Sequence, residues 1–265
     1  MNKRINPNLI RLAELTHNPD LKETSILAQK VDDPNVSGEF DIQDPKEYVQ
    51  LDTNGLYGKR AVISKFELPG YNNMNYEDTH TKLLGNKLYV PTPRIFMHFF
   101  NKILDAYKNK TPVLNAENSR IREEEILNMY LHLTKDHIAI YDPKKLGVWT
   151  WLNGKCINKK KKWHLETING LNNGKLVTTV EDLNPCLMND CYIDFTNLNN
   201  QGLANPNAKH NTQEYRQGEN IRYWKPEDGA VAGFYAYSDW ADLGCNWDPR
   251  FSYSGLGVFG CAEGA

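Results

Sequence analysis

Residues 231–262 read VAGFYAYSDWADLGCNWDPRFSYSGLGVFGCA, and this stretch decides the fold. From Phe234 to Tyr253, seven of twenty side chains are aromatic, against 11% in the whole chain. The rings are interleaved with small residues, whereas a core strand would cluster them. Tyr, Trp, Ser, Gly, Asn and Arg are also the residues that antibody paratopes use, because rigid rings give contact area at low entropic cost. The stretch is typical of a contact surface.

The rings alternate with small side chains at the spacing of a β-strand. Successive side chains of a strand point to opposite faces, so Phe234 and Ala236 would point inward while Tyr235 and Tyr237 point outward. That arrangement by itself fits an ordinary strand with one buried face. It leaves an outward face rich in Tyr and Trp, however, and contiguous exposed aromatic area usually marks an interaction surface.

The whole chain is long enough, at 265 residues, to bury one sizeable core. Its net charge is −2, from 31 basic and 33 acidic residues, so no overall field attracts nucleic acid or an anionic membrane. No signal-peptide or membrane-spanning run of apolar residues occurs. We expect a soluble protein with no nucleic-acid partner and no direct membrane insertion. The sequence does not indicate a location, and any display on a cell or virus surface would need another factor.

The five cysteines are an odd number and include no CxxC pair. One structural disulfide is compatible with this count, but reduced thiols packed as small hydrophobic side chains are the favoured interpretation. The residues concerned are Cys156, Cys186, Cys191, Cys245 and Cys261.

The pattern along the chain predicts a helical extension over residues 1–48 and a main domain over 49–265. Short helices are expected near residues 9–15 and 21–31, where polar turn residues dominate the remaining sequence. A strand or hairpin is expected over residues 56–66, before the Pro-Gly pair that follows.

Three helices are predicted in the first half of the domain. Asn75 followed by Asp78 is typical of a helix start, and Thr92 followed by a proline is another. A third helix is expected from about Ser119, with three glutamates early and an apolar face.

Short strands are predicted in the second half, over residues 138–141, 148–152, 176–180 and 191–195. The Asn153-Gly154 pair predicts a hairpin turn after the second of them. Helices followed by many short strands indicate an α+β domain rather than alternating βαβ units.

The motifs of common enzymes and metal sites are missing from the sequence. There is no nucleophile elbow, no phosphate-binding glycine loop and no helical pair of histidines. Glu77, Asp78 and His80 fit ordinary helix-start chemistry better than acid–base catalysis. Lys159 to Lys162 next to Trp163 could contact nucleic acid, but a solvated hairpin tip is favoured. We therefore expect no catalytic residues, no metal and no cofactor.

The segment 231–262, with its Ser254-Gly-Leu-Gly-Val-Phe ending, resembles the variable region of diversity-generating retroelement target proteins, in particular the archaeal, nanoarchaeal type. In these systems a reverse transcriptase copies a template with errors at adenines. The resemblance implies a C-type lectin fold, with two or three helices packed on short twisted antiparallel sheets. It is specific in the last 35 residues, and the fold that it implies covers about residues 49–265.

The composition of the segment agrees with that genetic mechanism. An AAC or AAT codon randomised at its adenines never gives Lys, Glu, Gln or Met, and residues 228–260 contain none of these. Trp240 and Trp247 would descend from AGG codons in the template.

The resemblance implies a variable region over about residues 231–257 on the ligand-facing surface. The variable, ligand-binding positions would be Gly233, Tyr235, Tyr237, Asp239, Trp240, Asp242, Gly244, Asn246, Trp247, Asp248, Arg250, Phe251, Tyr253 and Gly255. The scaffold positions between them would be Phe234, Ala236, Ser238, Ala241, Leu243, Cys245, Pro249, Ser252, Ser254 and Leu256. Residues 256–261 would form the last strand, close to the strand expected within 56–66.

Calcium-dependent sugar binding does not fit the segment. Asp239, Asp242 and Asp248 match no EF-hand spacing, and the proline triplet of carbohydrate-binding C-type lectins does not occur. The expected function is binding of a protein, or another cell-surface macromolecule, by a non-enzymatic chain, with a monomer favoured. The alternative is an enzyme on the related formylglycine-generating scaffold, with Cys245 or Cys261 as a reactive thiol.

Overall fold

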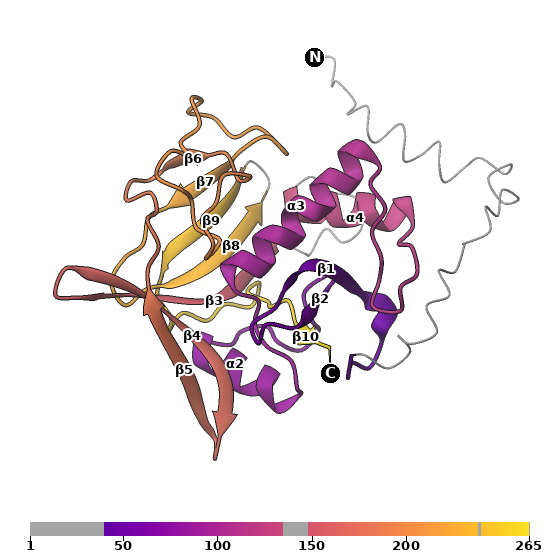
Figure 1. Cartoon of the computed structure of the whole chain (residues 1–265), viewed down its shortest axis with the longest axis horizontal. Coiled ribbons are helices and arrows are strands. Elements are labelled where there is room, and N and C mark those ends of the chain that lie inside the picture. The colour runs from indigo at the N-terminus through magenta and orange to yellow at the C-terminus, as the bar shows by residue number, and fades with distance from the viewer. Residues whose placement is uncertain (1–39, 135–147, 238–239, 265) are drawn as a thin grey trace, which may run out of the picture. The chain divides into compact units, whose positions relative to one another are not determined.

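Two β-sheets share one long helix, α3 (Pro93–Asn109), in the computed structural model of the chain (Figure 1). The structure describes residues 40–134, 148–237 and 240–264. Two further helices, α2 (Tyr76–Gly85) and α4 (Glu123–Thr134), complete an α+β fold, which confirms the predicted class. The helices expected near 9–15 and 21–31 and the strand expected at 138–141 lie outside the described residues.

The smaller sheet joins the two ends of the described chain. Its order is β1 (Tyr48–Asn54), β2 (Arg60–Ser64) and β10 (Cys261–Glu263), all antiparallel. Strand β2 lies within residues 56–66, where a strand or hairpin was expected, but the hairpin itself begins earlier, at Tyr48, and residues 55–59 form its turn. The last strand pairs with the expected partner but begins at Cys261 rather than at residue 256. A short 3-10 helix, η2 (Pro45–Glu47), precedes β1.

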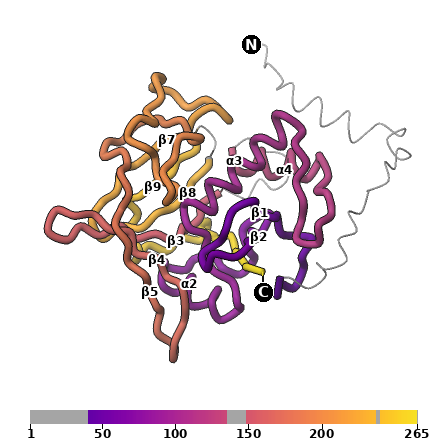
Figure 2. Tube along the Cα trace, viewed as in Figure 1, coloured from indigo at the N-terminus to yellow at the C-terminus, as the bar shows by residue number. Residues whose placement is uncertain are grey.

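The larger sheet runs in the order β5-β4-β3-β8-β9-β7-β6. Neighbouring strands are antiparallel except β7 and β9, which are parallel. Figure 2 shows the β4–β5 hairpin extending away from α3 and α4. The strand bounds are β3 (Val148–Lys159), β4 (Lys162–Asn172), β5 (Lys175–Asp182), β6 (Cys191–Ile193), β7 (Ile221–Trp224), β8 (Val231–Tyr237) and β9 (Trp240–Trp247).

Local capping explains where α2 and α3 begin. The Asn75 side chain accepts a hydrogen bond from the Asp78 backbone N–H at 2.9 Å, and the Thr92 hydroxyl accepts one from the Ile95 N–H at 3.3 Å. Both predicted starts are confirmed. The third helix begins at Glu123 rather than near residue 119, because the Asn115 side chain accepts the N–H groups of residues 117 and 119 and holds them in a turn.

The predicted hairpin turn at Asn153-Gly154 is wrong, since β3 continues through it, with a register shift in its pairing to β8 between Trp151 and Lys155. Asn153 is fully buried, and its amide bonds to both the C=O and the N–H of Ile168 at 2.7 and 2.8 Å. The true turn lies at Lys160-Lys161, whose φ angles of 52° and 69° are those of a tight two-residue hairpin. The lysine run is thus a hairpin tip, as favoured from the sequence.

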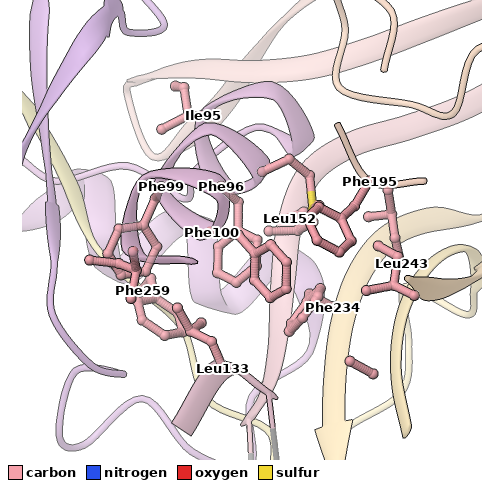
Figure 3. Close-up of a cluster of buried hydrophobic side chains, with 14 of the residues drawn as sticks. Ile95, Phe96, Phe99, Phe100, Leu133, Leu152, Phe195, Phe234, Leu243 and Phe259 are labelled. Carbon is pink, nitrogen blue, oxygen red and sulfur yellow. The ribbon is translucent and has the colours of Figure 1, made fainter. Parts of the chain in front are cut away.

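The main core lies between α3 and the two sheets (Figure 3). The Phe96 ring lies 4.9 Å from Phe234 of β8 and 5.3 Å from Phe259, which precedes β10. Phe100 contacts Phe234 and Phe195 at 5.4 and 5.3 Å. Because one helix packs against both sheets, their relative position is set by these phenylalanines.

The second face of the larger sheet is covered only in part. Helix α2 packs there against Trp151 of β3, through Tyr76 at 5.8 Å, and the Trp151 indole N–H donates to the Met74 carbonyl at 3.1 Å. The rest of this face, on β3, β8 and β9, carries the side chains described next.

We expect Asn153→Ala to lower the free energy of unfolding by about 2 to 4 kcal/mol, because it removes two buried hydrogen bonds and leaves the Ile168 backbone groups unsatisfied. Chemical denaturation measures this. Asn158→Ala on the same strand is the matched control and should cost less than about 0.5 kcal/mol, as is usual for sites away from buried networks. Equal effects of the two substitutions would contradict a stabilising role for the Asn153–Ile168 hydrogen bonds.

Candidate binding site

Strands β8 and β9 have one buried and one outward face, as the alternation predicted. Phe234, Ala236, Ala241, Leu243 and Cys245 are all fully buried in the main core. On the outward face Tyr235 is half-buried and Trp240 is 39% exposed. Ser238 and Asp239 lie outside the described residues. The backbone of β8 and β9 is therefore fixed by the core packing of its inward side chains, and the opposite side chains form an outward face.

Seven rings form what we call the aromatic face. Trp149 of β3 lies at its centre, with ring centroids 5.4 Å from Tyr235, 5.5 Å from Phe251 and 5.1 Å from Tyr253. Tyr235 in turn lies 6.4 Å from Trp240. The members are Trp149, Trp224, Tyr235, Trp240, Trp247, Phe251 and Tyr253.

A pocket of about 390 Å³ opens within the aromatic face, a size suited to a small ligand or one side chain of a partner. Rings dominate its lining, and carboxylate and amide groups complete it. It is lined by Trp149, Trp224, Tyr235, Asp242, Asn246, Trp247, Asp248 and Phe251.

Asp242 is the buried acid of this pocket, with 7% of its surface exposed. Burial raises the pKa of its carboxyl to about 7, although a hydrogen bond from Trp224 and the charge of Arg222 act in the opposite direction. The carboxyl therefore changes its charge near neutral pH. The Arg222 guanidinium lies 3.9 Å from the centre of the Trp224 ring, so one ring of the face already stacks with a cation.

Trp247 is partly a core residue. Its ring lies 5.6 Å from Trp151 and covers Gly233 and Gly244, where a Cβ atom would overlap the indole. Two of the expected variable positions, Gly233 and Gly244, are thus buried beneath the side chain of a third expected position, Trp247. Their lack of a side chain is what lets the indole lie flat on the β8–β9 pair.

The loop after β9 forms the rim of the pocket. The Arg250 guanidinium donates to both carboxylate oxygens of Asp248, at 3.0 and 2.8 Å, and this pair lowers the pKa of Asp248 to about 2. Backbone bonds from the Tyr76 N–H to Pro249 and from the Asn73 N–H to Tyr253 fix the loop to the start of α2. Phe251 and Tyr253 remain 43% and 41% exposed.

The structure brings most of the sequence-predicted positions together. Six of them line the pocket: Tyr235, Asp242, Asn246, Trp247, Asp248 and Phe251. Trp240, Arg250 and Tyr253 are exposed beside it, Gly255 is partly exposed next to Tyr253, and Tyr237 ends β8.

Two lining residues, Trp149 and Trp224, were missed because they come from β3 and β7, outside residues 231–257. A signal for each was present, since both tryptophans alternate with buried residues on their strands.

Catalytic and metal chemistry finds little support among the described side chains. His80 is fully buried, which lowers its pKa to about 3, and Asp78 bonds to the Asn75 cap. No cluster of three or more His, Cys, Asp or Glu residues in the described ranges could hold a metal ion. None of the helices described is long and apolar enough to cross a membrane.

The five cysteines are all free. Cys245 and Cys261 are fully buried, and burial raises the pKa of each thiol well above its usual value. A thiol in such a setting is a poor nucleophile, because the thiolate is the reactive form.

Comparison with known proteins yields no relative: no protein-family model, no curated protein and no solved structure matches the chain.

We expect Gly233→Ala to lower stability by about 1 to 3 kcal/mol, because its methyl group must displace the Trp247 indole. Combined with Trp247→Ala, the same substitution should cost almost nothing further, since the obstructing ring is gone. Denaturation of the two single variants and the double variant measures this coupling. Strict additivity would show that the indole does not lie on Gly233.

Thiol-reactivity mapping of the native protein should label Cys191 and Cys186 first, because both are partly exposed. Cys156, Cys245 and Cys261 should react only when the protein unfolds. Fast labelling of Cys245 or Cys261 under native conditions would contradict their burial and support the enzyme alternative.

Proposed function

We propose that this chain is a non-enzymatic binding protein of the retroelement-diversified type, with a C-type lectin fold, whose aromatic face docks a protein target. The observation that carries the proposal is the division of β8 and β9 into a buried core-facing set and an outward face, whose rings continue into the exposed loop after β9. Exposed aromatic area on this scale is costly to keep in water unless a partner covers it.

The energetics fit a protein partner. Trp and Tyr are enriched at the centres of protein interfaces, and each well-buried ring stabilises a complex by about 1.5 to 3 kcal/mol before association costs. Trp240, Phe251 and Tyr253 are the exposed rings whose burial would supply this binding free energy. Asp248 and Arg250 at the rim would tune specificity and the rate of association.

The scaffold supports replacement of the surface residues. Phe234, Ala236 and Leu243 hold β8 and β9 from the core side, so outward side chains such as Tyr235 and Trp240 can be exchanged without moving the backbone. Gly233, Gly244 and Trp247 are the exception, because their side-chain volumes depend on one another. Cys245 and Cys261, the candidate nucleophiles of the enzyme alternative, are both buried, and no other observation favours that alternative.

A pair of displayed libraries tests the proposal. One library randomises Tyr235, Trp240, Arg250, Phe251 and Tyr253, and the other randomises Phe234, Ala236, Ala241, Leu243 and Cys245. Most members of the first library should fold, and selection against an arbitrary purified protein should yield binders. Most members of the second should be unfolded, as judged by protease resistance. Equal fractions of folded members in the two libraries, or no binders from the first library, would overturn the proposal.

The gene offers an independent test. A near-copy of the segment encoding residues 231–257, differing almost only at adenines and lying near a reverse transcriptase gene, is the expected finding. Differences spread over all four bases would count against diversification by this mechanism.

A further inference from the structure

The pocket of the aromatic face is an open hollow whose lining rings differ in orientation. The Trp149 ring is nearly perpendicular to the rings of Tyr235 and Trp247, at 75° and 85°. Phe251 lies at 30° to Trp149 on the rim side. The lining rings therefore offer both faces and edges to a bound group, unlike a set of coplanar rings. A sugar ring, in contrast, stacks best on one broad flat surface.

The faces of these rings carry negative electrostatic potential, which attracts cations. Arg222, stacked 3.9 Å from the Trp224 ring centre, is an internal example of this attraction on the same face. A second cation in the pocket would lie among several rings at once. Quaternary and primary ammonium groups are bound in aromatic cages of this kind.

Asp242 supplies the negative charge of the pocket. The Asp248 carboxylate, the other acid of the lining, is already bonded to Arg250 through both oxygens. Asp242 is 7% exposed, and its charge is opposed by burial, so its ionised form lacks full compensation in the free protein. A bound cation would provide that compensation, whereas an anion or an apolar group would not.

We propose that this pocket binds an alkylammonium group, the end of a lysine side chain in free or methylated form, presented by the protein target. The inference rests on the proposed function for its protein partner. The pocket volume of about 390 Å³ admits the ammonium group together with part of its apolar stem. The ring walls pack on the methyl or methylene groups, and Asp242 neutralises the charge.

Titration calorimetry with capped lysine, capped trimethyl-lysine and tetramethylammonium tests the pocket directly. All three probes should bind, and trimethyl-lysine should bind at least about tenfold more tightly than its neutral isostere with carbon in place of nitrogen. Binding of the neutral isostere with equal affinity, or of a methyl glycoside in preference to the cations, would overturn the proposal.

Two matched pairs of variants locate the site. Asp242→Asn should weaken capped trimethyl-lysine binding about tenfold, whereas Asp105→Asn on the exposed side of α3 should have no effect. Phe251→Ala should weaken binding several-fold, whereas Tyr253→Ala, which removes an equally exposed ring that does not line the pocket, should change it less than about twofold. Equal effects within either pair would contradict the assignment.

The pH profile gives a readout that a merely structural role would not produce. The charged and titratable groups around Asp242 are Arg222 on β7, Tyr235 on β8, and Asp248 with Arg250 on the loop after β9. Of these, Asp242 changes charge near pH 7. Affinity for the cation should therefore rise about tenfold from pH 6 to pH 8, with release of a proton. Asp242→Asn should abolish this dependence, and a persistent slope in that variant would refute the role of Asp242.

Folding of Asp242→Asn is not expected to fail. Because the folded-state pKa of Asp242 lies above its unfolded value, ionisation of this group destabilises the fold as pH rises toward 7, and asparagine removes that cost.

The two proposals fail separately. If the library of surface variants yields protein binders while no ammonium probe binds the natural chain, the binding scaffold stands and the cage is wrong. If the probes bind but the library yields no binders, the cage stands as a small-cation site and the diversified scaffold is wrong.

Discussion

The contact between Phe96 of α3 and Phe234 of β8, with ring centroids 4.9 Å apart, is the constraint on which the rest of this structure depends. It fixes the face of β8 that turns inward, and every neighbouring side chain on the strand follows from strand geometry. The same helix holds Phe259, which leads into β10 and the smaller sheet. One buried cluster therefore sets both the relation between the sheets and the outward direction of Tyr235.

Features governed by local chemistry were predictable from the sequence. Asn75 and Thr92 cap helices through bonds that span only three residues, and the alternation on β8 is a property of the strand itself. The turn predicted at Asn153-Gly154 does not form, because the Asn153 side chain bonds to the backbone of Ile168, fifteen residues away, and this contact outweighs the local turn preference. Asn115 shortened the third helix by competing for its N–H groups, an effect that propensity alone does not reveal.

The site could be predicted only in part, because it is assembled from distant strands. Residues 231–257 supply Tyr235, Asp242, Trp247 and the rim, and the alternation pattern indicated the outward direction of Tyr235 on β8. The central ring, Trp149, comes from β3, which lies next to β8 only through sheet pairing. The pocket thus combines residues of this segment with rings from distant strands. No periodicity within 231–257 could indicate those rings.

Trp247 and the two glycines beneath it have a consequence for the size of any repertoire built on this scaffold. A large side chain at 247 requires minimal ones at 233 and 244, since all three share one volume above the β8–β9 pair. The three positions therefore behave as a single combinatorial unit with few permitted states. Random change spread evenly over the segment would therefore yield many chains that cannot pack there, whereas the exposed rim residues Phe251 and Tyr253 lie outside this shared volume.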